Sequence, residues 1–242
     1  TTVGRGGIIV NLDITTNKSN GTPGEVTGAS YCGVICGILY EASIINCTAR
    51  GSLTVTTQIG GGIVGYVDGG NVSLCRSFVS VYDGNGIGWL IGAMAIIYSG
   101  RYSSVSLSLS STNYVSSSEG DYVGGLIGYL YGTTSSDYSI SNCFSSSYVE
   151  GGDNTGGLIG SSTGYTIENC FSYGEVVGAA TVGGLCASST STTFNNCFWD
   201  TEASGQETSD GGTGKTTEEM MDRSTFEDAG WDFTDIWRIS DG

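Results

Sequence analysis

A short glycine box recurs along this chain and constrains its fold more than any other feature. Three copies read Gly-Gly-apolar-apolar-Gly and three more are degenerate, and the six start at residues 33, 61, 88, 124, 156 and 183. Consecutive copies are therefore 28, 27, 36, 32 and 27 residues apart. Self-similarity at a period of roughly 20–50 residues is the sequence signature of stacked-repeat architectures.

A second box, usually ending in Asn-Cys, follows most copies of the glycine box. It reads Ile-Ile-Asn-Cys at 44–47, Val-Ser-Leu-Cys at 72–75, Ile-Ser-Asn-Cys at 140–143, Ile-Glu-Asn-Cys at 167–170 and Phe-Asn-Asn-Cys at 194–197. Residues 105–109 take this place in the one repeat without the cysteine, and residues 8–14 resemble a first, incomplete coil. These segments predict about seven coils between residues 7 and 199.

The residue types of the repeats favour strands over helices. Gly, Ser, Thr and Val are frequent in them, and these residues disfavour helix, while Val and Thr suit strands. One repeat is too thin to bury its own apolar side, whereas stacked repeats bury a continuous core and pair their strands. We therefore predict an all-β fold, a right-handed parallel β-helix (solenoid) of about seven coils with a small C-terminal cap.

Three regions follow from this prediction. Residues 1–29 form an incomplete N-terminal coil and a polar loop, 30–199 the β-helix, and 200–242 the cap segment. Within the cap segment, Thr216 followed by early acidic residues predicts a helix start. An aromatic cluster follows, and we expect it to cover the open C-terminal end of the stack, because an uncovered end exposes core and strand edges. Its members are Phe226, Trp231, Phe233, Ile236 and Trp237.

Charge and composition exclude several functions. The net charge of −16, with only eight Lys and Arg, argues against a nucleic-acid partner and against an anionic membrane surface. No apolar stretch approaches the roughly 20 residues of a membrane span. The chain has no His, which removes the most common general base, and no pair of acids recurs on one predicted strand face. We expect no enzyme and no cofactor.

Calcium is the one ion that the sequence leaves open. Asp68, Asp83, Asp153 and Asp210 each lie beside Gly or Asn in expected turns. Calcium needs six to eight oxygen ligands, and no regular calcium-binding repeat is present. Solvated turns are therefore the default interpretation of these four residues.

The two boxes and the tail resemble a known family. The Gly-Gly-Leu-Ile-Gly copies at 124–128 and 156–160 resemble the GLUG motif of large bacterial and archaeal surface proteins, including adhesins of the filamentous-haemagglutinin type. The segments 196–202, 211–217 and 231–233 look like the tail that commonly ends such arrays. The resemblance covers roughly residues 30 to 239 and implies a β-helix at a cell surface. It carries no catalytic residues and no ligand, and the cysteines at 36 and 186 depart from the motif.

The cysteines suggest two disulfides. Cys36 and Cys47 are separated by the same interval as Cys186 and Cys197, and both pairs join the two boxes of one coil. We predict cross-core bonds Cys36–Cys47 and Cys186–Cys197, one near each end, which requires an oxidising compartment. The alternative is a ladder of buried free thiols that act as small hydrophobes.

The asparagines divide into two groups. Asn46, Asn142, Asn169 and Asn196 share one slot of the repeat, and we expect their amides to stack in a ladder. Asn17 and Asn20, in the polar stretch from Thr15 to Gly24, are the candidate glycosylation sites, since they lie in acceptor sequons outside that ladder.

The N-terminal residues are candidates for an assembly edge. Gly7, Ile8, Ile9 and Val10 read as a strand without a cap, which either continues a longer chain or pairs with another copy. The start at Thr1 predicts a processed product or an excised segment. We expect an extracellular, cell-surface structural or adhesive element whose partner is a surface glycan or protein. The alternatives are a subunit of a head-to-tail homopolymeric filament and a polysaccharide-processing β-helix enzyme.

Overall fold

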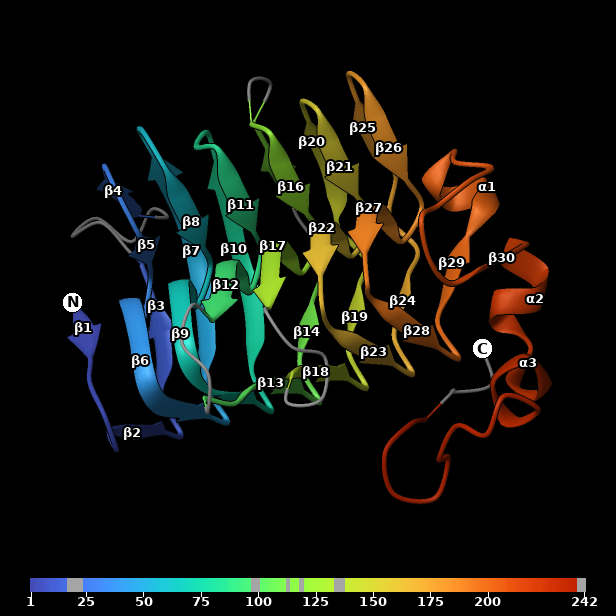
Figure 1. Cartoon of the computed structure of the whole chain (residues 1–242), viewed down its shortest axis with the longest axis horizontal. Helices are drawn as coiled ribbons and strands as arrows, with labels where there is room; N and C mark the ends of the chain where they lie inside the picture. Colours follow the sequence, from blue (N-terminus) through green and yellow to red (C-terminus); the bar gives the residue numbers. More distant parts are fainter. Residues whose placement is uncertain (17–23, 97–100, 112–113, 118–119, 133–137, 239–242) are drawn as a thin grey trace.

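The computed structural model describes residues 1–16, 24–96, 101–111, 114–117, 120–132 and 138–238. Within these residues strands are the main secondary structure, and every strand pairing is parallel. The all-β prediction is confirmed. Figure 1 shows the strands of successive repeats stacked side by side from β1 (Thr2–Val3) at the left to three short helices at the right.

The first sheet contains 12 strands in the described part of the chain. Its two long strands, β6 and β9, bend in the middle, and later repeats use a separate strand for each half. Its strands are β1, β2 (Ile8–Val10), β6 (Cys36–Ile45), β9 (Val64–Ser73), β12 (Ile91–Ile96), β13 (Ser103–Ser106), β17 (Ile127–Gly132), β18 (Tyr138–Ser141), β22 (Ile159–Thr163), β23 (Thr166–Glu168), β27 (Cys186–Thr190) and β28 (Thr193–Asn195).

The second sheet also has 12 strands among the described residues, and the third has six. The second is built from β3 (Asp13–Thr15), β4 (Glu25–Gly28), β7 (Thr48–Val55), β10 (Arg76–Tyr82), β14 (Leu109–Ser110), β15 (Tyr114–Ser116), β19 (Phe144–Ser145), β20 (Tyr148–Gly151), β24 (Phe171–Ser172), β25 (Val176–Gly178), β29 (Phe198–Asp200) and β30 (Thr213–Lys215). The third is built from β5 (Cys32–Gly33), β8 (Ile59–Gly61), β11 (Gly86–Gly88), β16 (Tyr122–Gly124), β21 (Asn154–Gly156) and β26 (Thr181–Gly183).

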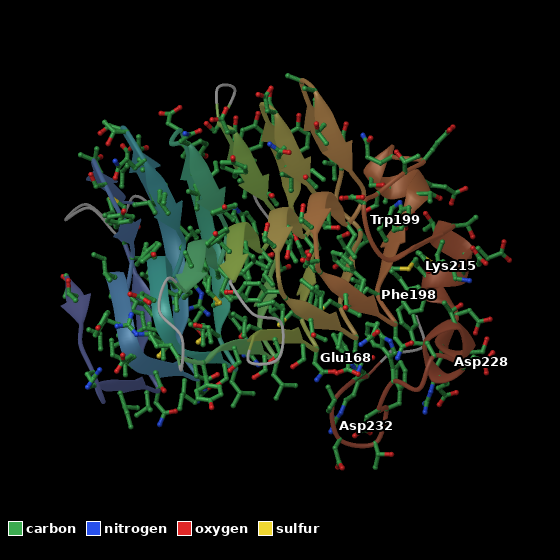
Figure 2. The ribbon with its side chains drawn as sticks, in the orientation of Figure 1. Glu168, Phe198, Trp199, Lys215, Asp228 and Asp232 are labelled. Atoms are coloured by element: carbon green, nitrogen blue, oxygen red, sulfur yellow. The ribbon has the colours of Figure 1, made fainter. Side chains whose placement is uncertain are left out.

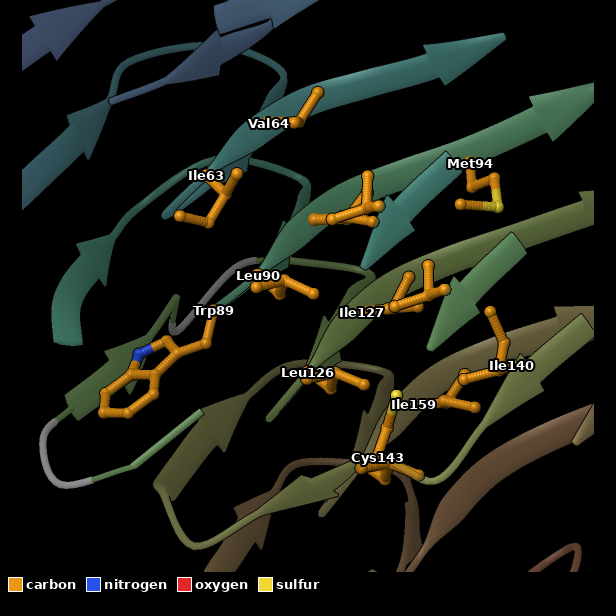
Figure 3. Close-up of a cluster of buried hydrophobic side chains, with 14 of the residues drawn as sticks. Ile63, Val64, Trp89, Leu90, Met94, Leu126, Ile127, Ile140, Cys143 and Ile159 are labelled. Atoms are coloured by element: carbon orange, nitrogen blue, oxygen red, sulfur yellow. The ribbon is translucent and has the colours of Figure 1, made fainter. Parts of the chain in front are cut away.

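The strand register places equivalent residues of successive repeats in columns, and these columns make the core. One column runs from Cys36 through valine and isoleucines to Cys186, and each member is buried. Figure 3 shows Val64, Ile127 and Ile159 of this column beside the buried leucines of the glycine boxes. The core is therefore continuous along the stack, as apolar burial between thin repeats requires.

The glycine box marks the point where the third sheet turns into the first. A Cβ added to Gly88 would lie 2.1 Å from the carbonyl oxygen of Ile91 and 2.6 Å from the amide nitrogen of Gly128. A Cβ on Gly124 would lie 2.0 Å from the oxygen of Ile127. Neither glycine has a positive φ. Glycine is therefore needed here because the backbone comes close to other backbone atoms, and not because of a positive φ.

Positive φ occurs instead at the slot just before the cysteine of the second box. Asn46, Asn142, Asn169 and Asn196 have φ of 51–52° there, and Leu74 and Leu107 occupy the same slot at 55° and 49°. Asn tolerates this left-handed conformation better than other residues with a Cβ, because its short amide can bond locally. The recurrence of Asn thus has a backbone cause that the sequence interpretation missed.

The chain after β29 closes the end of the stack and then folds back along its side. α1 (Thr201–Ser204) is followed by residues 206–210, which bond to the edges of the last repeat: the amides of Gly184 and Cys186 donate to Thr208 and Ser209. We call residues 206–210 the end strap. Trp199 covers Gly184 at the same end (Figure 2).

The aromatic cluster lies elsewhere than predicted. After α2 (Thr217–Met221) and α3 (Arg223–Glu227), Trp231 packs on Phe198, and Trp237 packs on Phe171. The phenylalanines of this column point away from the core, since the alternate serines are the buried ones. The cluster therefore packs on the outer face of the second sheet, and the prediction that it covers the C-terminal end of the stack was wrong. The helix predicted at Thr216 is confirmed, with a complete capping box.

Candidate functional site

A groove lies where β6 and β9 bend, on the outer side of the first sheet. Glu41 and Gly69 form the two bends, with φ of 46° and 70°. The groove has a volume of about 770 Å³. We call it the corner groove; it is lined by Arg5, Glu41, Ala42, Ser43, Gly69, Gly70, Asn71, Arg101, Tyr102 and Ser104.

A charge network forms one wall of the corner groove. The Arg101 guanidinium lies 2.6 Å from the Asp68 carboxylate and 2.9 Å from that of Glu41, and it stacks over the ring of Tyr40. Arg5 pairs with Glu41 at 2.5 Å. The hydrogen bond and charge of Asp68 raise the pKa of Arg101 further above its usual value. Two arginines thus balance two carboxylates, and the wall is neutral as a whole.

The floor and the opposite wall carry neutral polar groups. The Ser104 hydroxyl donates to Asn71 Oδ1 at 3.0 Å, and Asn71 Nδ2 donates to the Ser73 hydroxyl at 3.3 Å, so the Asn71 amide has a fixed orientation. The floor includes Gly70, where a side chain would not fit, because a Cβ there would lie 2.4 Å from the Ala42 carbonyl oxygen. Tyr102 stands at the rim with 68% of its surface exposed.

Sequence reasoning did not identify the corner groove. Its residues are far apart in the chain and meet only through the pairing of β6, β9 and β13. The available signal was the scarcity of basic residues, because two of the eight Lys and Arg of the chain line this one groove.

The five cysteines of the second box stack as a ladder, as the repeat spacing implied. The residues that follow them pair in register from one repeat to the next, with Ser108 in the repeat that lacks the cysteine. The thiol of Cys170 lies next to those of Cys143 and Cys197. Burial, with those two thiols, raises the pKa of Cys170 well above its usual value, and burial raises that of Cys75 to about 12.

The predicted disulfides Cys36–Cys47 and Cys186–Cys197 are not formed in the structure, which holds all eight cysteines as free thiols. The Cys197 thiol donates to the carbonyl of Asn195 at 3.3 Å, and the Cys186 thiol to that of Ser188 at 3.3 Å. The two boxes of a coil place their cysteines in different columns, with Cys36 and Cys186 ending the isoleucine column and Cys47 and Cys197 ending the thiol ladder. The arrangement corresponds to the alternative interpretation of buried free thiols.

The structure describes the asparagines of the second box but not the two candidate glycosylation sites. Asn196 Nδ2 donates to Asn169 Oδ1 at 3.5 Å, so one pair of the predicted amide ladder is in contact. Asn46 Nδ2 donates to Asn11 Oδ1 at 2.6 Å, outside the predicted set. Asn17 and Asn20 lie outside the described residues.

The assembly-edge candidates lie in and just before β2, at the N-terminal edge of the first sheet. Ile8, Ile9 and Val10 pair with Ser43, Ile44 and Ile45 of β6. Among the described residues β2 has no partner on its other side, and Ile8 and Val10 are 66% and 50% exposed. Gly7 precedes this strand, and its carbonyl accepts from the Ser43 amide.

The four aspartates considered for calcium do not converge on one site. Asp68 pairs with Arg101, and Asp210, in the end strap, accepts a hydrogen bond from the Ser189 amide. Asp83 lines a second hollow between the second and third sheets, and Asp153 is exposed. Glu168 is exposed on β23, in a column with Ser141 and Asn195 (Figure 2). Within the described ranges, no group of three or more His, Cys, Asp or Glu side chains is placed to hold a metal ion. No helix in that part of the chain is long and apolar enough to cross a membrane.

Comparisons with known proteins give no relative from which a function can be carried over. The chain has no significant match to a protein-family model, to a curated protein or to a solved structure.

Proposed function

We propose that this chain is a right-handed parallel β-helix that serves outside the cell as a structural or adhesive surface element and does not catalyse a reaction. One observation supports the proposal: equivalent residues of six repeats stack in register in three parallel sheets that share one continuous core. A chain that passes from sheet to sheet and returns one strand further along winds as a helix. The right hand follows from the strong preference of parallel crossover connections.

The surface role is supported by where polar groups lie. The core columns contain apolar residues, thiols and serines, so any recognition must use the outer faces. The resemblance of the glycine boxes and the tail to the GLUG repeats of surface adhesins supports the same location. The net charge of −16 favours a soluble, solvated rod.

A homopolymeric filament is the second candidate, and the exposed edge of β2 favours it. Head-to-tail pairing also needs a free edge at the other end. There the end strap bonds to Gly184 and Cys186, and Gln206 donates to the Val176 carbonyl at 2.9 Å. Natural proteins block sheet edges in this way to prevent strand addition. A filament would have to displace the strap, so the single rod is preferred. A polysaccharide-processing enzyme has no more support than the two acids of the groove wall, both paired with arginine.

Negative-stain electron microscopy of the purified protein at micromolar concentration tests the rod. Short single rods with the dimensions of one chain support the proposal. Regular filaments, lost when Ile8 is replaced by proline to remove an N–H group from the free edge of β2, would establish the filament instead. Labelling of intact producing cells with antibody and gold particles tests the location, and signal confined to the cell interior would contradict it.

A further inference from the structure

The tyrosines of this surface differ in whether their ring faces are free. Tyr114 and Tyr148 stack on one another along the second sheet, with centroids 4.9 Å apart, and the tilted ring of Tyr82 lies 6.1 Å from that of Tyr114. Stacked rings cover each other's faces and present mainly their edges. Tyr102, at the rim of the corner groove, makes no ring contact with another described residue. Its 68% exposure leaves much of the aromatic ring accessible to a ligand.

Hydroxyl and amide groups lie in the groove below this free ring. Ser43, Asn71 and Ser104 face outward from neighbouring strands, and the bonds among Asn71, Ser73 and Ser104 fix the amide before any ligand arrives. Such fixed groups lose little conformational freedom on binding. The volume of about 770 Å³ lies within the range of small-ligand sites, and the lining residues come from successive repeats of the stack.

The charge of the groove selects a class of ligand. The chain carries a net charge of −16, which repels anionic ligands. In the groove wall, Arg5 and Arg101 are balanced by Glu41 and Asp68, so no uncompensated positive charge offsets that repulsion. Arg5 nevertheless exposes 74% of its side chain and presents N–H donors to a neutral acceptor. A free aromatic face, fixed hydroxyl and amide groups and a paired arginine suit a neutral sugar.

We propose that the corner groove binds a neutral oligosaccharide, with a pyranose ring stacked on Tyr102 and its hydroxyls bonded to Asn71 and Ser104. The inference rests on the proposed surface function and names the ligand of an adhesive site. Sugar hydroxyls replace the water that now hydrates these groups, while the apolar face of the ring covers Tyr102.

The test measures binding of cellohexaose, maltohexaose, mannohexaose and chitohexaose by titration calorimetry and saturation-transfer NMR, with hexagalacturonate as the acidic comparison. At least one neutral sugar is expected to bind. Tyr102→Ala should weaken that binding roughly tenfold, the loss expected for one aromatic stacking contact. Tyr102→Phe should bind within about twofold of the parent, because the ring face is kept. Tyr173→Ala, which alters an exposed tyrosine that follows β24 and stacks on Phe171 far from the groove lining, serves as the control and should leave binding unchanged.

Two results would overturn the inference: no neutral sugar binds at millimolar concentration, or binding is indifferent to Tyr102→Ala in a variant with an unchanged melting temperature. Binding of hexagalacturonate alone would also overturn it. Mass spectra of the sugars after long incubation separate this failure from failure of the proposed function. Shortened products would refute the non-catalytic proposal, whereas intact sugars that do not bind refute only the ligand.

Discussion

Two glycines of one strand should respond in opposite ways to the same added methyl group. Gly86 and Gly88 both lie in β11, and neither has a positive φ. A Cβ on Gly86 would make an ordinary contact of 3.5 Å with Ile59 Cγ1. A Cβ on Gly88 would lie 2.1 Å from the Ile91 carbonyl oxygen and 2.6 Å from the Gly128 nitrogen, both of which are backbone atoms. The pair therefore isolates close approach from the general effect of replacing glycine.

The magnitude follows from what must move. Overpacking a tight site costs about 1–3 kcal/mol. A shifted turn also disturbs the bonds from the Leu90 and Ile91 amides to the Leu126 carbonyl, at 3.0 and 3.2 Å. Each buried donor left without a partner costs about 1–3 kcal/mol more. Gly88→Ala should therefore destabilise by about 4 kcal/mol or more. Gly86→Ala should be neutral or stabilising by up to about 1 kcal/mol, because alanine restricts the unfolded chain.

Thermal melting followed by circular dichroism, with hydrogen exchange at the Leu90 and Ile91 amides, measures the difference. The two variants should melt roughly 10 °C or more apart, with Gly88→Ala lower and its amides less protected. If Gly88→Ala melts within about two degrees of Gly86→Ala, the close approach assigned to the glycine box is refuted.

Four shorter predictions concern other parts of the stack. Asn46→Leu should lower the free energy of unfolding by about 1–2 kcal/mol, because leucine is disfavoured at φ 52° and the bond to Asn11 is lost; a melt unchanged from the parent would contradict this. Trp231→Ala should destabilise the C-terminal aromatic cluster by about 3–5 kcal/mol yet leave the hydrogen-exchange protection of β6 and β7 unchanged, since each repeat contacts only its neighbours. An equal loss of protection in the first and last repeats would be inconsistent with that independence. Thiol titration after denaturation without reductant should find all eight cysteines, whereas four would restore the two disulfides predicted from sequence. Burial raises the pKa of Cys36, Cys75 and Cys186 from 9.0 to about 12, so above pH 9 the unfolded chain loses thiol protons that the folded chain keeps. Stability should therefore fall between pH 9 and 12, and replacing the three cysteines by alanine should reduce that fall; an equal fall in the variant would contradict the assignment.

Much of the architecture was predictable because each sequence repeat contains the residues that determine it. The glycine-box spacing anticipated the all-β stack, and the second box anticipated the register of the thiol ladder. Both are local patterns whose physical cause, burial between thin neighbours, acts at every repeat. The helix start at Thr216 was predictable for the same reason, since a capping box needs only neighbouring residues.

The remaining features depend on contacts that one repeat does not contain. The sequence suggested that the aromatic cluster covers the end of the stack. The outward column of Phe144, Phe171 and Phe198 instead offers the cluster an apolar surface, and the polar end strap covers the end. The disulfide spacing was regular, but spacing along the chain does not determine whether two columns approach across the core. The corner groove unites Arg5, Glu41 and Arg101, which no sequence period connects.

The in-register stack is tested most directly by one distance along a single column. Thr27 and Val177 stand at the ends of a column that passes through Thr54, Tyr82, Ser116 and Glu150. Five steps of about 4.8 Å place their backbones about 24 Å apart, although 150 residues separate them in the chain. Nitroxide labels can be attached to bioorthogonal side chains at these two positions. The distance between them, measured by pulsed electron–electron double resonance, should show one narrow distribution near that value. A broad distribution, or a single distance beyond about 40 Å, would contradict the parallel in-register stack on which the proposed β-helix rests.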